Sequence, residues 1–141
     1  MADQDFDKLL RALKLKVTSQ RLAILKILAV ESIYLAPEEI WRRMRRTAVR
    51  AGLPTVYRNL EELSACGVLI KILHPDRRLY YYFCPKSHHH HHFVCISCRK
   101  VEDLSFCGME LINKEVKKDL KGAVVSHLMQ VYGHCKDCLA C

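Results

Sequence analysis

The sequence predicts an α+β fold in two parts. Segments with apolar residues at helical spacing fill the first 67 residues, and two β-rich runs, VLIKIL and RLYYYF, follow them. After residue 83 the pattern changes to short strands with one helix, and a run of five histidines leads into a C-x-x-C pair. A chain of 141 residues can form one ordinary domain, or two small ones held by further cross-links. We therefore expect a first domain at residues 1–83 and a second at 84–141.

No segment is long and apolar enough to predict a signal peptide or a membrane span. The most hydrophobic run, LAILKILAV, is short and is interrupted by Lys26. We therefore expect a cytoplasmic protein. In a reducing compartment, cysteines in C-x-x-C pairs are more often metal thiolates than disulfides.

The first three helices are predicted from apolar spacing and from residues that start helices. Apolar residues at 6–13 recur at helical spacing, so the first helix lies there. Thr18 or Ser19 can cap a second helix, because a hydroxyl oxygen accepts a hydrogen bond from a backbone N–H of the first turn. Pro37 suits the first turn of a third helix, in which we expect Trp41 to be a core residue.

A fourth helix and a hairpin complete the first domain. The helix in LPTVYRNLEELSACG starts at Pro54 or Thr55 and stops at Gly67, and a turn at residues 74–76 joins the two β-rich runs. Helices followed by a hairpin fit a winged helix-turn-helix. In that arrangement the fourth helix lies in the major groove of DNA, and the hairpin forms the wing.

The start of the fourth helix carries the candidate DNA contacts. Thr55, Tyr57 and Arg58 offer a hydroxyl, a phenol and a guanidinium, groups that bind phosphates and base edges. The alternative is that Tyr57 packs in the core and Arg58 is merely solvated. The formal net charge of +8 falls mostly on the first domain, with +6 at residues 1–83 and +2 at 84–141. This distribution favours a polyanionic partner for the first domain.

A helix and a strand are expected between the histidine run and the last cysteines. An apolar stripe from Phe106 to Leu120 predicts the helix, which ends before Gly122. AVVSHLMQVYG then alternates like a strand, with His127 on the same face as Val125. A histidine on an apolar face is usually a hydrogen-bonded core residue, unless other metal ligands converge on it.

Two C-x-x-C pairs indicate a closed metal site. A C-x-x-C turn delivers two thiolates to one ion, and Zn²⁺ takes four thiolates in a tetrahedron. The four cysteines of the two pairs are Cys95, Cys98, Cys135 and Cys138. We prefer structural zinc over a redox dithiol pair, since the rest of a thioredoxin-like pattern is absent. An alternative pairing uses Cys141, which forms another C-x-x-C with Cys138.

The histidine run can serve two further metal sites. If it is a strand, successive side chains point to opposite faces, so His90 and His92 share one face. His89 and His91 share the other. Same-face Cα atoms lie roughly 6–7 Å apart, from which two imidazoles can hold one ion. Each face needs further ligands, and the candidates are Cys84, Glu102, Asp103, Glu110, His127 and His74. The alternative is a solvated polar tract with weak, non-specific metal affinity.

Six motifs in a fixed order span almost the whole chain. They are LKLKVTSQRLAIL, APEEIW, TVYRNLEELSACGVL, HHHHHFVCISC, KVEDL and VYGHCKDC. With them the chain resembles the ferric uptake regulator family of metal-sensing bacterial transcription factors. The resemblance implies an N-terminal winged helix-turn-helix, a small C-terminal α/β dimerisation domain, a homodimer, and metal-dependent binding to a palindromic double-stranded DNA operator. It also implies a transcriptional repressor rather than an enzyme.

The resemblance assigns roles to residues at matching positions. The cysteines of the two C-x-x-C pairs match those that hold structural zinc. A regulatory metal site at the hinge between the domains matches His90, His92 and Asp103. A further site in the dimerisation domain matches His89, His91, Glu110 and His127. Lys16 matches a residue that enters the minor groove, and recognition-helix contacts match Tyr57 and Arg58.

Departures from the family pattern bear on the sensed metal. Tyr34 stands where many members have a histidine of the regulatory site, and Cys84 stands near the position of a missing carboxylate. A similar cysteine appears in zinc uptake regulators, the branch that the chain most resembles. Because a soft thiolate beside imidazoles favours Zn²⁺ over Fe²⁺, we expect Cys84 to join the regulatory site. Arg99 replaces the usual glycine after the second zinc cysteine.

The sequence thus predicts a zinc-responsive repressor that controls metal uptake genes, with Zn²⁺ rather than Fe²⁺ or Mn²⁺ at the regulatory site. An iron-responsive regulator that does not use Cys84, or a peroxide sensor, is the alternative within the family. A metal store or chaperone would use the histidine run but would not need TVYRNL. The H-x-E and P-C-x-x-C pattern of zinc deaminases is absent, which argues against an enzyme of that class.

Overall fold

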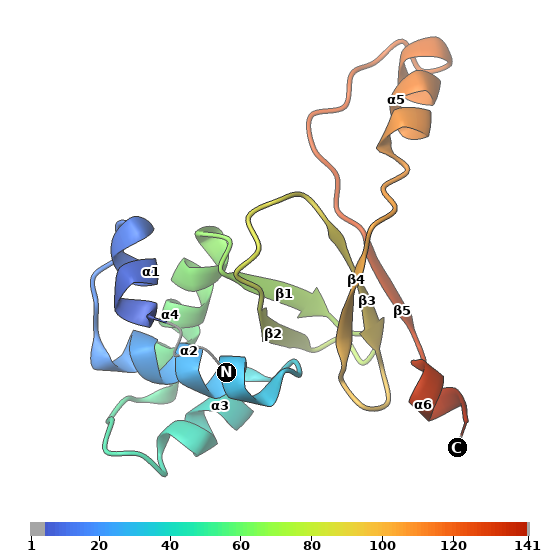
Figure 1. Cartoon of the computed structure of the whole chain (residues 1–141). Helices are drawn as coiled ribbons and strands as arrows, with labels where there is room; N and C mark the ends of the chain where they lie inside the picture. Colours follow the sequence, from blue (N-terminus) through green and yellow to red (C-terminus); the bar gives the residue numbers. More distant parts are fainter. Residues whose placement is uncertain (1–4, 141) are drawn as a thin grey trace. The chain divides into compact units, whose positions relative to one another are not determined.

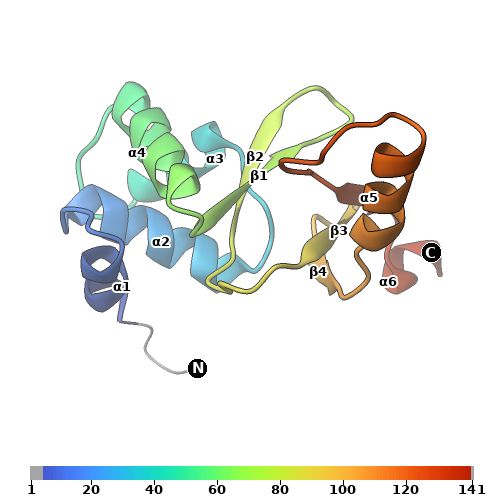
Figure 2. The same ribbon diagram turned by 90° about the horizontal axis from the view of Figure 1, so that it is seen from above.

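The chain consists of two compact units, which divide after Ser87, whereas the expected boundary lay after residue 83. The computed structural model describes residues 5–140. The first unit contains four helices and a hairpin, and the second contains a three-stranded sheet with two helices (Figure 1 and Figure 2). None of the helices in this described range is long and apolar enough to cross a membrane.

Four helices form the body of the first unit. Their bounds are α1 (Phe6–Ala12), α2 (Ser19–Glu31), α3 (Pro37–Met44) and α4 (Leu53–Ala65). Thr18 caps α2, because its hydroxyl oxygen accepts a hydrogen bond from the Arg21 backbone N–H at 3.2 Å. At the start of α3, the Glu39 carboxylate accepts a hydrogen bond from the Ala36 backbone N–H at 2.8 Å. The four helices predicted from spacing and start signals are therefore all present.

A hairpin of β1 (Leu69–Leu73) and β2 (Leu79–Phe83) follows α4 directly. The strands pair antiparallel with Lys71 opposite Tyr81, and Leu35 adds an isolated bridge to Tyr81. In the turn, the Asp76 carboxylate accepts a hydrogen bond from the Arg78 backbone N–H at 2.8 Å. Helices followed by this hairpin confirm the predicted winged helix-turn-helix order.

One apolar core holds the helices and the hairpin of the first unit together. Its fully buried residues include Leu10, Ile24, Leu25, Leu28, Leu35, Ile40, Val56, Leu60 and Leu63. Phe6 of α1 packs edge-on against Phe83 of β2, with ring centroids 5.8 Å apart. Trp41 packs against the same core as predicted, and its indole N–H donates to the Ala51 carbonyl at 3.0 Å. The core therefore fixes α4 relative to the wing.

Gly67 follows α4 in a backbone conformation that favours glycine. Its φ is +80°, and a Cβ placed there would meet nothing within 4 Å, so a side chain is disfavoured by the backbone alone. We expect Gly67→Ala to lower the free energy of unfolding by about 1 kcal/mol. Gly52→Ala is the matched control, because Gly52 has a φ of −80°. Urea unfolding measures both variants, and equal losses would contradict the backbone explanation.

A mixed sheet forms the centre of the second unit. Its strands are β3 (His91–Cys95), β4 (Val101–Leu104) and β5 (Gln130–Gly133), in the order β4-β3-β5. The central strand β3 pairs antiparallel with β4 and parallel with β5. Helices α5 (Met109–Lys118) and α6 (Lys136–Leu139) lie beyond opposite ends of this sheet (Figure 1). Because β3 begins within the histidine run and ends at Cys95, the central strand connects that run to the first cysteine pair.

Regular strand structure in the second unit is shorter than predicted. β3 begins at His91 rather than at the start of the histidine run. Only the last four residues of AVVSHLMQVYG form a strand, because β5 pairs with β3 from Gln130 opposite His92 onward. Residues 123–129 have no regular secondary structure.

Apolar side chains of the second unit are largely exposed. No residue of α5 is buried, so its predicted apolar stripe does not enter a core. Val125, which we expected to share a face with His127, is 98% exposed, and His127 is itself only half-buried, so the interpretation of His127 as a core residue is wrong. Within the described part of this single chain, no second layer covers these side chains. Exposed apolar residues grouped in this way are typical of subunit interfaces.

Candidate metal centres and nucleic-acid interface

The four cysteines of the C-x-x-C pairs lie together in the second unit. The parallel pairing of β3 and β5 places Cys95 opposite Gly133, just before the second pair. Cys95 Sγ lies 3.7 Å from Cys138 Sγ, and the Sγ atoms of Cys98 and Cys135 are 3.6 Å apart. All four sulfur atoms lie within 4.8 Å of one another. Strand pairing thus unites two cysteine pairs that are distant in sequence.

The sulfur separations fit a tetrahedral zinc site. Four Zn–S bonds of about 2.3 Å give sulfur–sulfur edges of about 3.8 Å in a tetrahedron. The measured separations of 3.6 and 3.7 Å are close to that value. A disulfide needs sulfur atoms about 2.0 Å apart. The cluster therefore has the donors and the spacing of a closed structural site rather than of two disulfides.

Backbone groups around the cluster stabilise negative charge on sulfur. Burial acts to raise the pKa of Cys95, but backbone N–H groups, led by that of Cys98, outweigh it and bring the pKa to about 6. One of these donors is the Cys135 N–H, at 3.3 Å from Cys95 Sγ. Hydrogen bonds with the sulfurs of Cys135 and Cys95 raise the pKa of Cys138. Cys95 therefore ionises more readily than an ordinary cysteine. Cation binding would release protons from its neighbours.

Arg99 adopts the left-handed backbone conformation that usually belongs to glycine. Its φ is 68°, so the turn after Cys98 keeps a glycine-like geometry with a non-glycine residue. Across this turn the Cys95 N–H donates to the Lys100 carbonyl at 2.9 Å. Cys141, the alternative zinc ligand, lies outside the described residues.

His90 and His92 lie on one face, as strand alternation predicted. Their ring centroids are 4.6 Å apart, and Asp103 Oδ1 lies 3.8 Å from Nε2 of each ring. Asp103 reaches both rings because it pairs with His92 across β3 and β4. Glu102, the neighbouring candidate, instead pairs with Lys100 at 3.0 Å. The second unit therefore provides a set of two imidazoles and one carboxylate.

Two other candidate ligands, Cys84 and His74, belong to the first unit, as does Tyr34, which replaces a histidine of the family pattern. Cys84 follows β2 and is 5% exposed. Tyr34 is buried and packs against Tyr80 and His74, with ring centroids 5.0 and 5.8 Å away. His74 Nδ1 accepts a hydrogen bond from the Asp76 backbone N–H at 3.1 Å. Tyr34 and His74 therefore take part in the packing of the first unit beside the turn of its wing.

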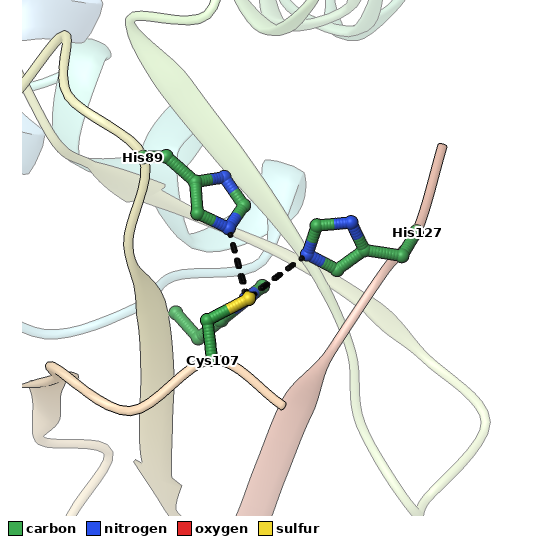
Figure 3. A group of neighbouring side chains, drawn as sticks. His89, Cys107 and His127 are labelled. Carbon is green, nitrogen blue, oxygen red and sulfur yellow. Dashed lines mark hydrogen bonds between the residues drawn. The ribbon is translucent and has the colours of Figure 1, made fainter. Parts of the chain in front are cut away.

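His89, His91 and His127 converge with a cysteine that sequence reasoning missed. His91 Nε2 lies 3.1 Å from Nε2 of each of the other two histidines. The Cys107 sulfur lies between His89 and His127 (Figure 3), and the four ligand atoms are within 4.8 Å of one another. Glu110, expected at this site from the resemblance, is exposed in the first turn of α5 and does not belong to this group. The structure brings together three of the four expected residues and adds Cys107.

Candidate DNA-binding residues of the first unit surround a depression at the start of α4. Its volume is about 460 Å³, and its lining includes Lys16, Thr18, Gln20, Thr55, Arg58 and Asn59. Lys16 and Arg58 are exposed there. Arg21 and Glu62 also line it and form an ion pair with each other. Lys16, Thr55 and Arg58, three of the predicted DNA contacts, therefore lie on one face of the first unit.

Tyr57 is accessible at the surface of α4. It is 40% exposed, so the alternative that it packs in the core is wrong. Its hydroxyl donates to the Glu38 carboxylate at 2.5 Å, and this hydrogen bond lowers the pKa of Glu38. Arg78 of the wing turn lies 3.6 Å from the same carboxylate. Glu38 therefore holds Tyr57 in place while leaving the ring exposed.

Comparisons with known proteins agree with this geometry. The ferric uptake regulator family matches residues 12–132. A zinc uptake regulation protein of Mycobacterium tuberculosis is 33% identical over 121 residues, which cover 86% of this chain and 92% of that protein. A ferric uptake regulation protein of Staphylococcus epidermidis is 31% identical over 139 residues, which cover 98% and 96%. A zinc uptake regulator solved with zinc and DNA has a TM-score of 0.76 at 22% identity, covering 96% of this chain and 91% of that one. The similarity to this last structure shows that the two chains share a fold.

Proposed function

The chain belongs to the ferric uptake regulator family, and on that premise we propose that it is a DNA-binding transcriptional repressor that responds to zinc. The family is one of transcription regulators, not of enzymes. The observation that carries the proposal is the presence, in one chain, of a winged helix-turn-helix with exposed basic residues and of a unit rich in imidazole and thiolate clusters. Metal uptake genes are the proposed targets, and action on them would take place in the cytoplasm.

Each group of candidate ligands has its own proposed role. Structural zinc is held by the four cysteines of the C-x-x-C pairs. The regulatory cation is held by Cys84, His90, His92 and Asp103. A further cation site includes His89, His91 and His127.

The donor atoms favour zinc at the regulatory site. A thiolate beside imidazoles is a softer set than the oxygen and nitrogen donors that suit Fe²⁺ or Mn²⁺. The relatives do not decide the metal, because those named for zinc and for iron match at 33% and 31% identity. The preference for zinc therefore rests on Cys84, in the segment that joins β2 to the histidine run.

A homodimer on a palindromic duplex is the proposed DNA-binding form. Exposed apolar side chains of the second unit are available for an interface between two copies, among them Leu111, Leu120, Val125 and Leu128. A cation bound by ligands from both units would restrict the positions that the two recognition helices of the dimer can take. By linkage, DNA binding would then tighten cation binding by the same factor.

A DNA-binding titration with separate metals tests the proposed function. The probe is a duplex selected from a random library by the zinc-loaded full-length protein. We expect zinc, added under anaerobic conditions, to promote binding at a lower free concentration than ferrous iron or manganese. Equal or better activation by iron contradicts zinc sensing. The absence of salt-sensitive binding by the fully metallated protein contradicts a DNA regulator and favours a metal store.

Cys84→Ser is expected to weaken zinc-dependent binding to that duplex by about tenfold or more, because serine is a poor ligand in place of a thiolate. Binding by the metal-free protein should not change, and thermal unfolding confirms that the first unit remains folded. Cys66→Ser is the matched control, since Cys66 caps the end of α4 and belongs to none of the ligand groups found in residues 5–140. A wild-type zinc response in Cys84→Ser would remove Cys84 from the site.

A further inference from the structure

We propose that Cys107 is the fourth ligand of the cation site formed by His89, His91 and His127, and that Glu110 is not a ligand. The site is then a centre of three imidazoles and one thiolate that takes Zn²⁺ in preference to Fe²⁺ or Mn²⁺. This inference rests on the proposed function only for the presence of a cation site at these histidines.

The four ligand atoms form a compact group. The Nε2 atoms of His89 and His127 each lie 3.1 Å from His91 Nε2. Cys107 Sγ lies 3.4 Å from His89 Nε2, 3.2 Å from His91 Nε2 and 3.6 Å from His127 Nε2. Figure 3 shows the imidazoles of His89 and His127 directed at the sulfur from two sides. The sulfur thus meets a nitrogen from every histidine of the site.

These separations match the edges of a zinc tetrahedron. Zn–N bonds of about 2.0–2.1 Å and a Zn–S bond of about 2.3 Å give nitrogen–nitrogen edges of about 3.3 Å and nitrogen–sulfur edges of about 3.5 Å. The measured distances run from 3.1 to 3.6 Å. Hydrogen bonding alone accounts poorly for this arrangement, because His91 Nε2 meets two other ring nitrogens and the sulfur, whereas one ring nitrogen offers either a single proton or a single lone pair. A shared cation explains all of the contacts together.

The identity of the fourth ligand decides the preferred cation. Glu110 is exposed in the first turn of α5, where a negative charge is stabilised by the helix N-terminus. A carboxylate with three imidazoles suits Fe²⁺ and Mn²⁺ as well as Zn²⁺, whereas a thiolate shifts the preference to the softer ion. Four protein ligands also close the site, as in structural rather than catalytic zinc centres.

The site joins segments that the sheet does not hold together. His89 precedes β3, Cys107 lies in the loop between β4 and α5, and His127 lies in the irregular stretch before β5. Cys107 is separated from His91 by 16 residues and from His127 by 20. A shared cation would therefore restrain both α5 and the stretch at residues 123–129.

Cobalt substitution of the full-length protein tests the sulfur ligand. Co²⁺ enters zinc sites, and its bonds to thiolate produce a charge-transfer absorption that imidazole and carboxylate ligands do not produce. Every protein compared carries Cys84→Ser, so the proposed regulatory site contributes no sulfur. The four-cysteine cluster contributes equally to each spectrum. The added substitutions are Cys107→Ser, Cys107→Asp and Glu110→Gln.

We expect Cys107→Ser to lose the absorption of one thiolate and to bind cobalt at this site about tenfold more weakly or worse. Cys107→Asp should lose the same absorption but keep the cobalt stoichiometry, which excludes a folding defect as the cause. Glu110→Gln should change neither property. Unchanged absorption in both Cys107 variants, or loss of this cobalt in Glu110→Gln, would overturn the assignment.

His127→Ala separates failure of the ligand assignment from failure of the proposed site. A lower cobalt stoichiometry in His127→Ala supports the cation site. If the stoichiometry does not change, there is no cation site at these histidines, and both the site and its sulfur ligand are overturned. If it falls while Cys107→Ser keeps its full absorption, only the assignment of Cys107 fails.

Discussion

Serine in place of Cys95 is expected to remove the structural zinc and, with it, the cooperative unfolding transition of the second unit. Structural zinc supplies about 10–16 kcal/mol to small zinc-dependent folds. The net stability of a whole domain is about 5–15 kcal/mol. Loss of one thiolate from a four-thiolate site can therefore exceed the stability that the small sheet has on its own. Cys95 is the most informative ligand to change, because it is fully buried and accepts the Cys135 N–H.

Zinc content and calorimetry of the same samples check this expectation. Wild-type protein should contain the zinc and show a transition of the second unit that disappears after chelation. The transition of the first unit should persist in Cys95→Ser, since that unit has its own core. Cys66→Ser, the matched control, should keep its zinc. A redox dithiol pair would instead make stability depend on oxidant and not on chelator, and wild-type zinc content in Cys95→Ser would contradict the structural role.

The first unit could be predicted from the sequence because its signals are local. Thr18 caps a helix through its own neighbours, and Gly67 meets a backbone requirement at the end of α4. The hairpin follows from two β-rich runs on either side of a short turn. The metal-binding role of the C-x-x-C pairs could be predicted equally well, because their spacing alone brings two thiolates to one ion.

The second unit could be predicted less fully because it depends on pairing between distant segments. Alternation placed the histidines on the correct faces but could not set where β3 and β5 begin. The loop between β4 and α5 brings Cys107 to the histidines, and no periodic pattern describes a loop. The sequence feature that could have identified this ligand is a cysteine in SFCGME, which lies outside the C-x-x-C pairs and close to the expected ligand Glu110.

Helical spacing also could not say what covers an apolar face. The apolar spacing correctly predicted a helix at α5, yet no residue of that helix is buried. The period of the apolar residues indicates which side chains share a face of the helix. Whether that face is buried depends on a second layer packed against it. In the proposed homodimer that layer comes from a second copy, which a single chain cannot reveal.

Arg58→Ala is expected to cause the largest loss of DNA binding among substitutions on α4. Arg58 is exposed on the face that also carries Lys16 and Thr55. A bidentate arginine contact to a base edge contributes about 1–3 kcal/mol, or roughly 5- to 150-fold in Kd. A phosphate contact would instead weaken binding to all sequences and reduce the salt slope by about 1. We expect the base-edge result, with the loss greatest on the selected duplex, because Arg58 lies in the first turns of the recognition helix.

Fluorescence anisotropy at several salt concentrations distinguishes these two kinds of contact. It is measured on the zinc-loaded protein with the selected duplex and with a scrambled one. Lys114→Ala is the matched control, because it removes one positive charge from an exposed residue of α5 in the second unit. If the control loses as much affinity as Arg58→Ala, the effect is that of net charge alone. That outcome would contradict placement of α4 in the major groove, whereas a loss confined to Arg58→Ala and to the selected duplex supports it.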